Sequence, residues 1–121
     1  MLTSNSVTAA STWETMTRRL PDAADAVQRA RESTAVPVAL MDLGDNVGRG
    51  SACDSTFLPA ELLRQEAPGW VVTLAYPGAV QEAVRADIAG RFDGWVGGKS
   101  DTMHGRPVRV RGTVSALHDG R

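Results

Sequence analysis

The strongest constraint on the fold is a short apolar segment that runs directly into a glycine-rich polar loop. Residues 36–41 read Val-Pro-Val-Ala-Leu-Met and are apolar on both alternating faces. A strand buried within an α/β sheet has this pattern, and Pro37 is tolerated because it stands near the beginning of the segment. Residues 42–54 form the loop, and the polar residues at its end are suitable caps for a helix that begins near Thr56. The sequence therefore predicts a strand–loop–helix unit.

Hydrophobic spacing along the rest of the chain predicts an alternation of helices and strands. The expected helices are residues 11–20, 22–33, 56–67 and 77–90, and the expected strands are residues 36–41, 70–76, 92–96 and 108–114. In the third helix, Leu58, Leu62 and Leu63 are expected to face inward. The early βαβ order favours a layered α/β domain with antiparallel strands added at the C-terminal end. We expect residues 1–20 to form a tail and a helix, and residues 21–121 to form one domain that is incomplete at its C-terminal end.

Composition and charge exclude several classes of function. The chain has 121 residues, which is enough for one core, and its 13 Lys and Arg residues are scattered rather than clustered. The formal net charge is −1, so no footprint for nucleic acid or an anionic membrane is present. Cys53 is the only cysteine, and no intramolecular disulfide can form. Residues 1–10 do not resemble a signal peptide and no apolar run can span a bilayer, which together predict a cytoplasmic protein.

The loop and the start of the next helix carry the candidate ligand-binding residues. Backbone N–H groups in a glycine-rich turn before a helix can bind an anion, and carboxylate or amide oxygens can bind a hard cation or a substrate. The candidates are Asp45, Asn46, Gly48, Gly50, Asp54, Ser55 and Thr56. The alternative is a loop whose Asp and Asn side chains cap their own backbone, as these residues often do. The loop matches neither a Walker P-loop nor the GxGxxG fingerprint of dinucleotide-binding proteins.

Several motifs follow one another from this loop to the end of the chain. Residues 45–58 read Asp-Asn-Val-Gly-Arg-Gly-Ser-Ala-Cys-Asp-Ser-Thr-Phe-Leu, residues 77–90 form a Pro-initiated helix that ends in Ala-Gly, and residues 97–101 read Gly-Gly-Lys-Ser-Asp. Gly-Arg-Pro-Val at residues 105–108, Gly-Thr-Val at residues 112–114 and Asp-Gly-Arg at residues 119–121 complete the series. In this order, the chain resembles the carboxy-terminal domain of the microcystinase C (MlrC) family over roughly residues 20 to 121.

The chain departs from the family pattern at three positions. Val47 and Arg49 stand where the family usually has proline and glycine, and Tyr76 stands where it has aspartate. The Arg49 side chain would occupy space that glycine leaves open. If the family brings this loop close to a ligand, this protein is expected to do so differently.

The resemblance implies a function that is divided between two domains. Members of the family are two-domain, zinc-dependent hydrolases or relatives of unknown substrate, and the best-known ones degrade cyanobacterial peptide toxins. Their zinc ligands belong to the amino-terminal metallopeptidase domain, so the resemblance implies no catalytic residue, metal site or cofactor in this chain. It implies a domain that packs on that partner and lines its cleft, with Lys99 and Asp101 as secondary candidates. A stand-alone module that binds a small anion or another protein is the alternative.

Other chemical sites are weaker interpretations of the same residues. A zinc site built from His104, His118 and Asp101 is disfavoured, because both histidines lie in turn-like segments and are expected to be exposed. Cys53 near a helix start could be a reactive thiolate, but a small buried residue is favoured. Trp13 and its helix are the expected contact with the partner, and without that partner the uncovered apolar patch would favour a homo-oligomer.

Overall fold

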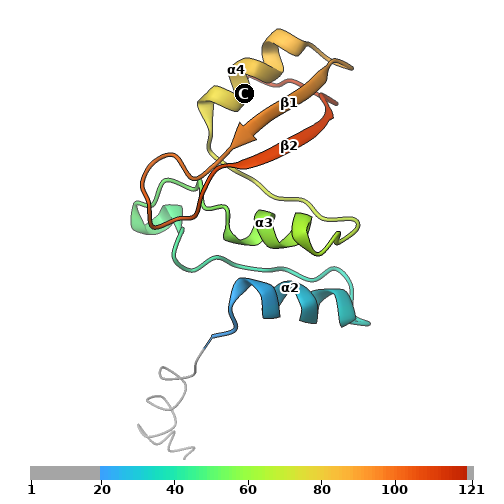
Figure 1. The fold of residues 1–121 in the computed structure, drawn as a ribbon, viewed down its shortest axis with the longest axis vertical. Coiled ribbons are helices and arrows are strands. Elements are labelled where there is room, and N and C mark those ends of the chain that lie inside the picture. Colours follow the sequence, from blue (N-terminus) through green and yellow to red (C-terminus); the bar gives the residue numbers. More distant parts are fainter. Residues whose placement is uncertain (1–19, 120–121) are drawn as a thin grey trace, which may run out of the picture.

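The computed structural model describes residues 20–119, which contain three helices, one short 3₁₀ turn and one β-hairpin (Figure 1). In chain order these are α2 (Ala23–Glu32), η1 (Val47–Arg49), α3 (Phe57–Arg64), α4 (Pro77–Ala86), β1 (Arg91–Val96) and β2 (Val108–Thr113). The α/β class and the antiparallel pair at the C-terminal end are confirmed. The prediction of a helix at residues 11–20, including Trp13, falls outside the described residues except for its last position.

Helix α2 begins where the sequence predicts, because its first turn has a good cap. The Asp22 carboxylate accepts a hydrogen bond from the Asp25 N–H at 2.9 Å. Val27 is fully buried, and the Gln65 side-chain amide donates to the Ala24 carbonyl oxygen at 3.0 Å. These contacts hold α2 against α3.

Helix α3 is shorter than predicted and buries a narrower face. It begins at Phe57 with Pro59 inside the first turn, where a missing N–H group costs nothing. Leu62 is buried and Leu58 is half-buried, but the prediction that Leu63 faces inward is wrong, since Leu63 is 40% exposed. Successive helix positions point about 100° apart. A neighbouring helix that covers Leu62 therefore leaves Leu63 in solvent.

Helix α4 has the predicted start and an earlier end. Pro77 occupies its first turn, and the helix stops at Ala86 instead of continuing to residue 90. Its apolar positions remain largely uncovered: Val80 and Val84 are 59% and 57% exposed, and Ile88, just beyond its end, is 58% exposed.

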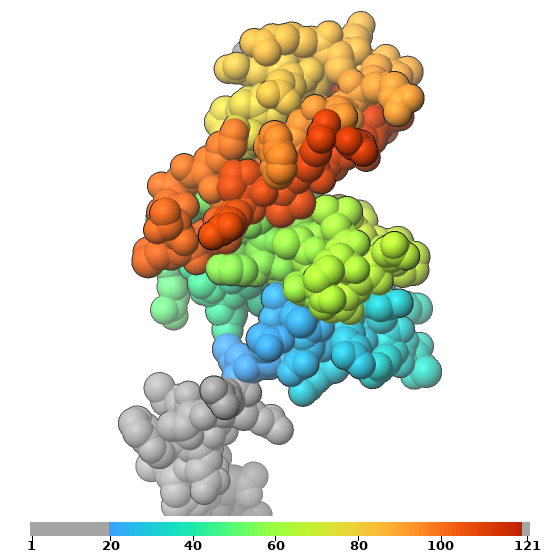
Figure 2. All heavy atoms as spheres, in the orientation of Figure 1, coloured from blue at the N-terminus to red at the C-terminus, as the bar shows by residue number. Residues whose placement is uncertain are grey.

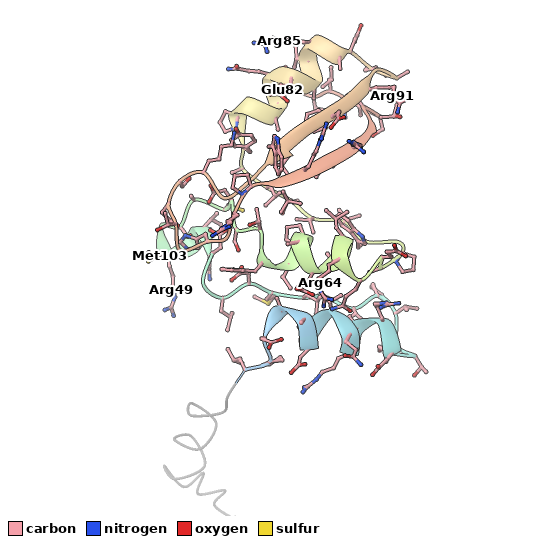
Figure 3. The ribbon with its side chains drawn as sticks, viewed as in Figure 1. Arg49, Arg64, Glu82, Arg85, Arg91 and Met103 are labelled. Atoms are coloured by element: carbon pink, nitrogen blue, oxygen red, sulfur yellow. The ribbon has the colours of Figure 1, made fainter. Side chains whose placement is uncertain are left out.

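The hairpin lies against α4 through its inner face. Strands β1 and β2 are antiparallel, and Val96 lies opposite Val108. A Cβ atom at the buried Gly94 would come within 2.5 Å of the Glu82 carboxylate, so the absence of a side chain lets α4 approach the strand (Figure 3).

The outer face of the hairpin is charged. Arg109 and Arg111 project into solvent, as the alternation in their strand predicts. The Arg109 side chain pairs with Asp93 on β1 at 2.7 Å, and the Arg111 side chain approaches the same carboxylate at 3.2 Å. This face is solvated and needs no further partner.

Residues 36–41 and 70–76 are extended, but the prediction that they form paired strands is wrong. Neither segment hydrogen-bonds to another strand within the described residues. The backbone bonds found there join the Ala75 N–H to the Cys53 carbonyl oxygen at 2.8 Å and the Val80 N–H of α4 to the Tyr76 carbonyl oxygen at 3.3 Å. A β-strand is defined by backbone hydrogen bonds to a neighbouring strand. An apolar sequence pattern alone does not provide that neighbour. Both segments run in the same direction and α3 runs back between them, so the path is that of a βαβ unit without its sheet (Figure 1).

The molecule is elongated, with two packed groups of elements. Figure 2 shows α2 and α3 against each other at one end, and α4 with the hairpin at the other. Within the described residues the buried hydrophobic side chains are those of Val27, Leu62 and Val114. Between residues 20 and 119, no helix is both long and apolar enough to cross a membrane.

Candidate functional site

Asp45 organises the loop between residues 42 and 56. Its Oδ1 accepts hydrogen bonds from the Ser51 hydroxyl and, at 2.8 Å, from the Cys53 N–H, while Oδ2 accepts the Ser55 N–H at 2.7 Å. Burial alone would raise the pKa of Asp45, but these hydrogen bonds outweigh it and lower the pKa below its usual value. Asp45 therefore stays ionised and fixes the path of the loop from residue 51 to residue 55.

Asn46 and Gly50 shape the tip of the loop. The Asn46 side chain accepts the Gly48 N–H at 2.9 Å and caps the η1 turn. Gly50 ends that turn with φ of 86°, a left-handed conformation that favours glycine. Gly44 and Gly48 do not use this conformation, because their φ values are not positive.

Asp42 has a role that the sequence does not reveal. Its Oδ1 accepts the Gly44 N–H at 2.9 Å, and its Oδ2 accepts the Ser55 hydroxyl at 2.6 Å. The signal in the sequence is its position, the first polar residue after an apolar segment. Asp42 and Asp45 together hold both ends of the loop at Ser55.

Asp54 joins this loop to a distant one. It is 1% exposed, and its Oδ2 accepts the N–H groups of Lys99 and Ser100, both at 2.9 Å. Its backbone carbonyl oxygen accepts the Gly98 N–H at 2.6 Å. Burial would raise the pKa of Asp54, but the two N–H donors outweigh it and lower the pKa. Its Oδ1 is buried without a hydrogen-bond partner among the described residues.

Thr56 brings in a third segment. Its N–H donates to the His104 carbonyl oxygen at 2.9 Å, and its hydroxyl donates to the Arg106 carbonyl oxygen at 2.8 Å. A Cβ atom at Gly97, where φ is 64°, would lie 2.5 Å from the Thr56 methyl group, and one at Gly105 would overlap the Thr56 hydroxyl. We call residues 54–56, 97–100 and 104–106 the three-loop junction.

His104 is more engaged than the sequence predicts. Its Nδ1 lies 2.6 Å from the Asp101 carboxylate, and its Nε2 lies 3.4 Å from the Gly44 carbonyl oxygen. The hydrogen bond to Asp101 is the main reason that the pKa of His104 is raised. The expectation of an exposed loop histidine is wrong for His104, whose side chain is 18% exposed, and right for His118. Among residues 20–119, no three His, Cys, Asp or Glu side chains cluster in a way that could hold a metal ion.

The junction brings together three motifs that stand far apart in the sequence: Asp-Ser-Thr, Gly-Gly-Lys-Ser-Asp and Gly-Arg-Pro. The family model described as "MlrC C-terminus" matches residues 40–121, which contain all three. The chain belongs to the MlrC family.

A similarity to one member of the family agrees with this assignment. Microcystinase C from a Sphingomonas species is 35% identical to the chain over 92 residues, which are 75% of this chain. The chain spans 18% of the length of that MlrC protein. The described domain therefore corresponds to a small part of a much larger relative.

Arg49 and Tyr76 are two of the positions expected to depart from the family pattern. Arg49 points away from the body of the molecule, at the same end as Met103 (Figure 3). The Lys99 ammonium lies 4.7 Å from the centre of the Tyr76 ring, which is a cation–π contact.

The candidate residues fall into two groups by exposure. Asp54, Ser55 and Thr56 are buried and bond to other parts of the chain, so they control the shape of the loop. The residues that reach solvent are Gly48, Gly50, Lys99 and Asp101, with Asp45 and Asn46 half-buried. An open hollow of about 470 Å³ lies beside the junction, lined by Phe57, Arg106 and Val108 among others. The accessible polar groups are therefore on the outside of a rigid frame.

Proposed function

We propose that this chain is the non-catalytic C-terminal domain of a zinc-dependent hydrolase of the MlrC type. In this role it packs on an amino-terminal catalytic domain and presents residues 45–56 to the rim of the shared cleft. The observation that carries the proposal is the three-loop junction, in which three MlrC motifs from separate parts of the chain hold one loop in a fixed shape. The small share of microcystinase C that the chain spans supports a role within a larger protein.

The rigidity of the loop is what a cleft-lining element requires. A binding surface works best when its accessible groups are held by buried neighbours with satisfied hydrogen bonds. Here Asp45 accepts three hydrogen bonds and Asp54 accepts two through its carboxylate, while the exposed tip carries Gly48 and Arg49. The loop can therefore contact a substrate or a partner without first losing conformational entropy.

The proposal assigns the chemistry of zinc to the other domain. A catalytic zinc ion needs about three protein ligands and one open position. Within the described residues, His104 is already bound to Asp101 and lies near the Gly44 carbonyl oxygen, and His118 lies elsewhere in an exposed segment. The proposed role of this chain is to position the substrate and to enclose it in the cleft. The proposed enzyme is cytoplasmic, and Cys53, the single cysteine of this chain, suits a reducing compartment.

Reconstitution tests the proposal directly. The chain would be mixed with a separately produced microcystinase C that lacks the region matched here, and association and peptide hydrolysis would be measured. Microcystin, which the name of that relative indicates, is a suitable first substrate. We expect a stable complex whose hydrolysis exceeds that of the truncated relative by at least tenfold, because cleft-lining groups position the substrate. No complex, or a complex with unchanged hydrolysis, would refute the proposed function.

A further inference from the structure

Two extended segments expose apolar side chains that a folded α/β domain normally buries. In residues 36–41, Val36 is 85% and Met41 is 77% exposed, and in residues 70–74, Val71 is 91% exposed. Neither segment contains a charged residue. Single exposed apolar residues are ordinary, but uncharged segments with several of them are typical of the centre of an interface.

The backbone of both segments is also without partners. No backbone hydrogen bond between described residues involves residues 36–41 or residues 70–74. Such N–H and C=O groups must bond to water or to another chain, and extended backbone of this kind readily accepts an added strand. The apolar side chains and the unpaired backbone therefore coincide in the same two segments.

The position of the segments indicates what covers them. The match to the MlrC C-terminus begins at residue 40, inside the first segment, and the match to microcystinase C leaves more than four-fifths of that relative outside it. Helix α2 stands directly before the first segment in this chain and leaves Val36 and Met41 exposed, so α2 does not cover them. Because the matched region is the C-terminus of the family, the amino-terminal part of a longer MlrC protein is the source of cover to which we commit.

We infer that residues 36–41 and 70–74 form the docking surface for the amino-terminal domain, which rests on the function proposed above. The partner adds extended chain to the unpaired backbone and covers Val36, Met41 and Val71 with an uncharged, apolar face. The exposed stripe of α4 does not belong to this surface, since its backbone is already bonded within a helix. The charged outer face of the hairpin is likewise excluded, because burying Arg109 and Arg111 would cost solvation.

Hydrogen exchange on the complex tests where the partner binds. The 121-residue chain would be compared alone and in complex with the truncated microcystinase C described above. We expect amides in residues 36–41 and 70–74 to exchange at least tenfold more slowly in the complex, while amides of α4 are unchanged. Protection that is already present in the monomeric chain would overturn the inference, as would protection that grows with the concentration of the chain alone, which would indicate a second copy.

Matched substitutions give an independent readout. Val71→Lys and Val38→Lys place a charge on the proposed surface, and Val84→Lys places the same charge on α4 at a position that is 57% exposed. We expect the two surface variants to weaken association at least tenfold and the α4 variant less than twofold. Circular dichroism would confirm that each variant is folded, and Val38→Lys serves if Val71→Lys is not. Association that is equally strong in all variants refutes the docking surface but leaves the proposed function intact, whereas no association with the unsubstituted chain refutes both.

Discussion

Around Asp54 the chain buries polar groups, whereas residues 36–41 and 70–74 leave apolar groups in solvent. Asp54, Ser55 and Thr56 are 1%, 6% and 1% exposed, and Asp54 and Thr56 bond to groups 45 to 50 residues away. In the extended segments Val36, Met41 and Val71 are 85%, 77% and 91% exposed, and the backbone forms no ladder bonds within the described residues. Directional hydrogen bonds fix geometry, while apolar burial supplies most of the folding free energy. In this domain the hydrogen bonds that fix geometry are formed, but apolar burial is incomplete.

The comparison separates two contributions to the domain: hydrogen bonds that fix its shape and apolar burial that stabilises it. The three-loop junction gives one loop a unique shape without help from a large apolar core. In the docking arrangement inferred above, the extended segments obtain further stabilisation from the partner domain. A domain of a larger protein can have this combination, because its loop takes its shape before another domain buries its exposed apolar side chains.

The largest effect is expected when the carboxylate at the centre of the junction is removed. Asp54→Ala leaves the N–H groups of Lys99 and Ser100 without an acceptor, and we expect the free energy of unfolding to fall by about 3 kcal/mol. Urea unfolding followed by tryptophan fluorescence measures this loss. Asp93→Ala, which removes an exposed carboxylate from the hairpin, is the control and should cost much less. Equal losses would show that the buried position of Asp54 confers no special importance.

The close packing of the junction gives the next effect. In Gly97→Ala, the new Cβ atom meets the Thr56 methyl group and the Asp54 carbonyl oxygen at a positive φ, and we expect a loss of about 2 kcal/mol. Gly112→Ala on β2 is the matched control, because no atom lies within 4 Å of its Cβ position. Thermal unfolding of the two variants would be compared. A Gly97→Ala variant as stable as Gly112→Ala would mean that the three segments are not tightly joined.

Asp45 distinguishes a structural loop from a functional one. Asp45→Ala removes the acceptor for Ser51, Cys53 and Ser55, and we expect a loss of about 1.5 kcal/mol. If the loop also lines the cleft, the double variant Asp45→Ala, Asn46→Ala should reduce turnover or substrate affinity in the reconstituted enzyme. The assay must be run well below the melting temperature of the variant. Unchanged kinetics in a folded double variant would make the loop purely structural.

The smallest effect is a dependence of stability on pH near neutrality. The pKa of His104 is raised chiefly by Asp101, so the stabilisation is complete below the usual histidine pKa and is lost as the pH rises through the raised value. We expect the urea midpoint to fall slightly between about pH 6 and pH 8.5. Asp101→Asn removes the main cause and should flatten this change. The same slope in both proteins would assign it to another group.

Local features of the fold are predictable from the sequence because their causes are local. Asp22 caps α2 from a neighbouring position, Pro77 starts α4, and the alternation of Val108 to Arg111 gives the outward face of β2. The boundaries differ by a few residues, as helix ends commonly do. The extended segments are a different case. Their apolar pattern is that of buried strands, but burial and pairing depend on neighbours that the local sequence does not specify.

The candidate site is predictable in its residues but less so in its connections. The motifs indicate the loop from Asp45 to Thr56, and the structure shows which of its residues are buried. The contact of His104 with Gly44 joins groups 60 residues apart, so neither spacing nor propensity reveals it. The sequence does not reveal the roles of Asp42 and Ser51 for a related reason. Their partners are set by how the loop folds back on itself, which depends on Asp45.

The junction also determines the order in which this domain can assemble. The bonds from Lys99 and Ser100 to Asp54 close loops of 45 and 46 residues, and the bond from Thr56 to Arg106 closes one of 50. Contacts so distant in the chain form late, because the entropy of loop closure must be overcome before they contribute. During synthesis, Asp54 and Thr56 cannot complete these bonds until residue 106 has left the ribosome. Residues 54–56, the first segment of the junction in the sequence, are therefore among the last parts of the domain to be fixed.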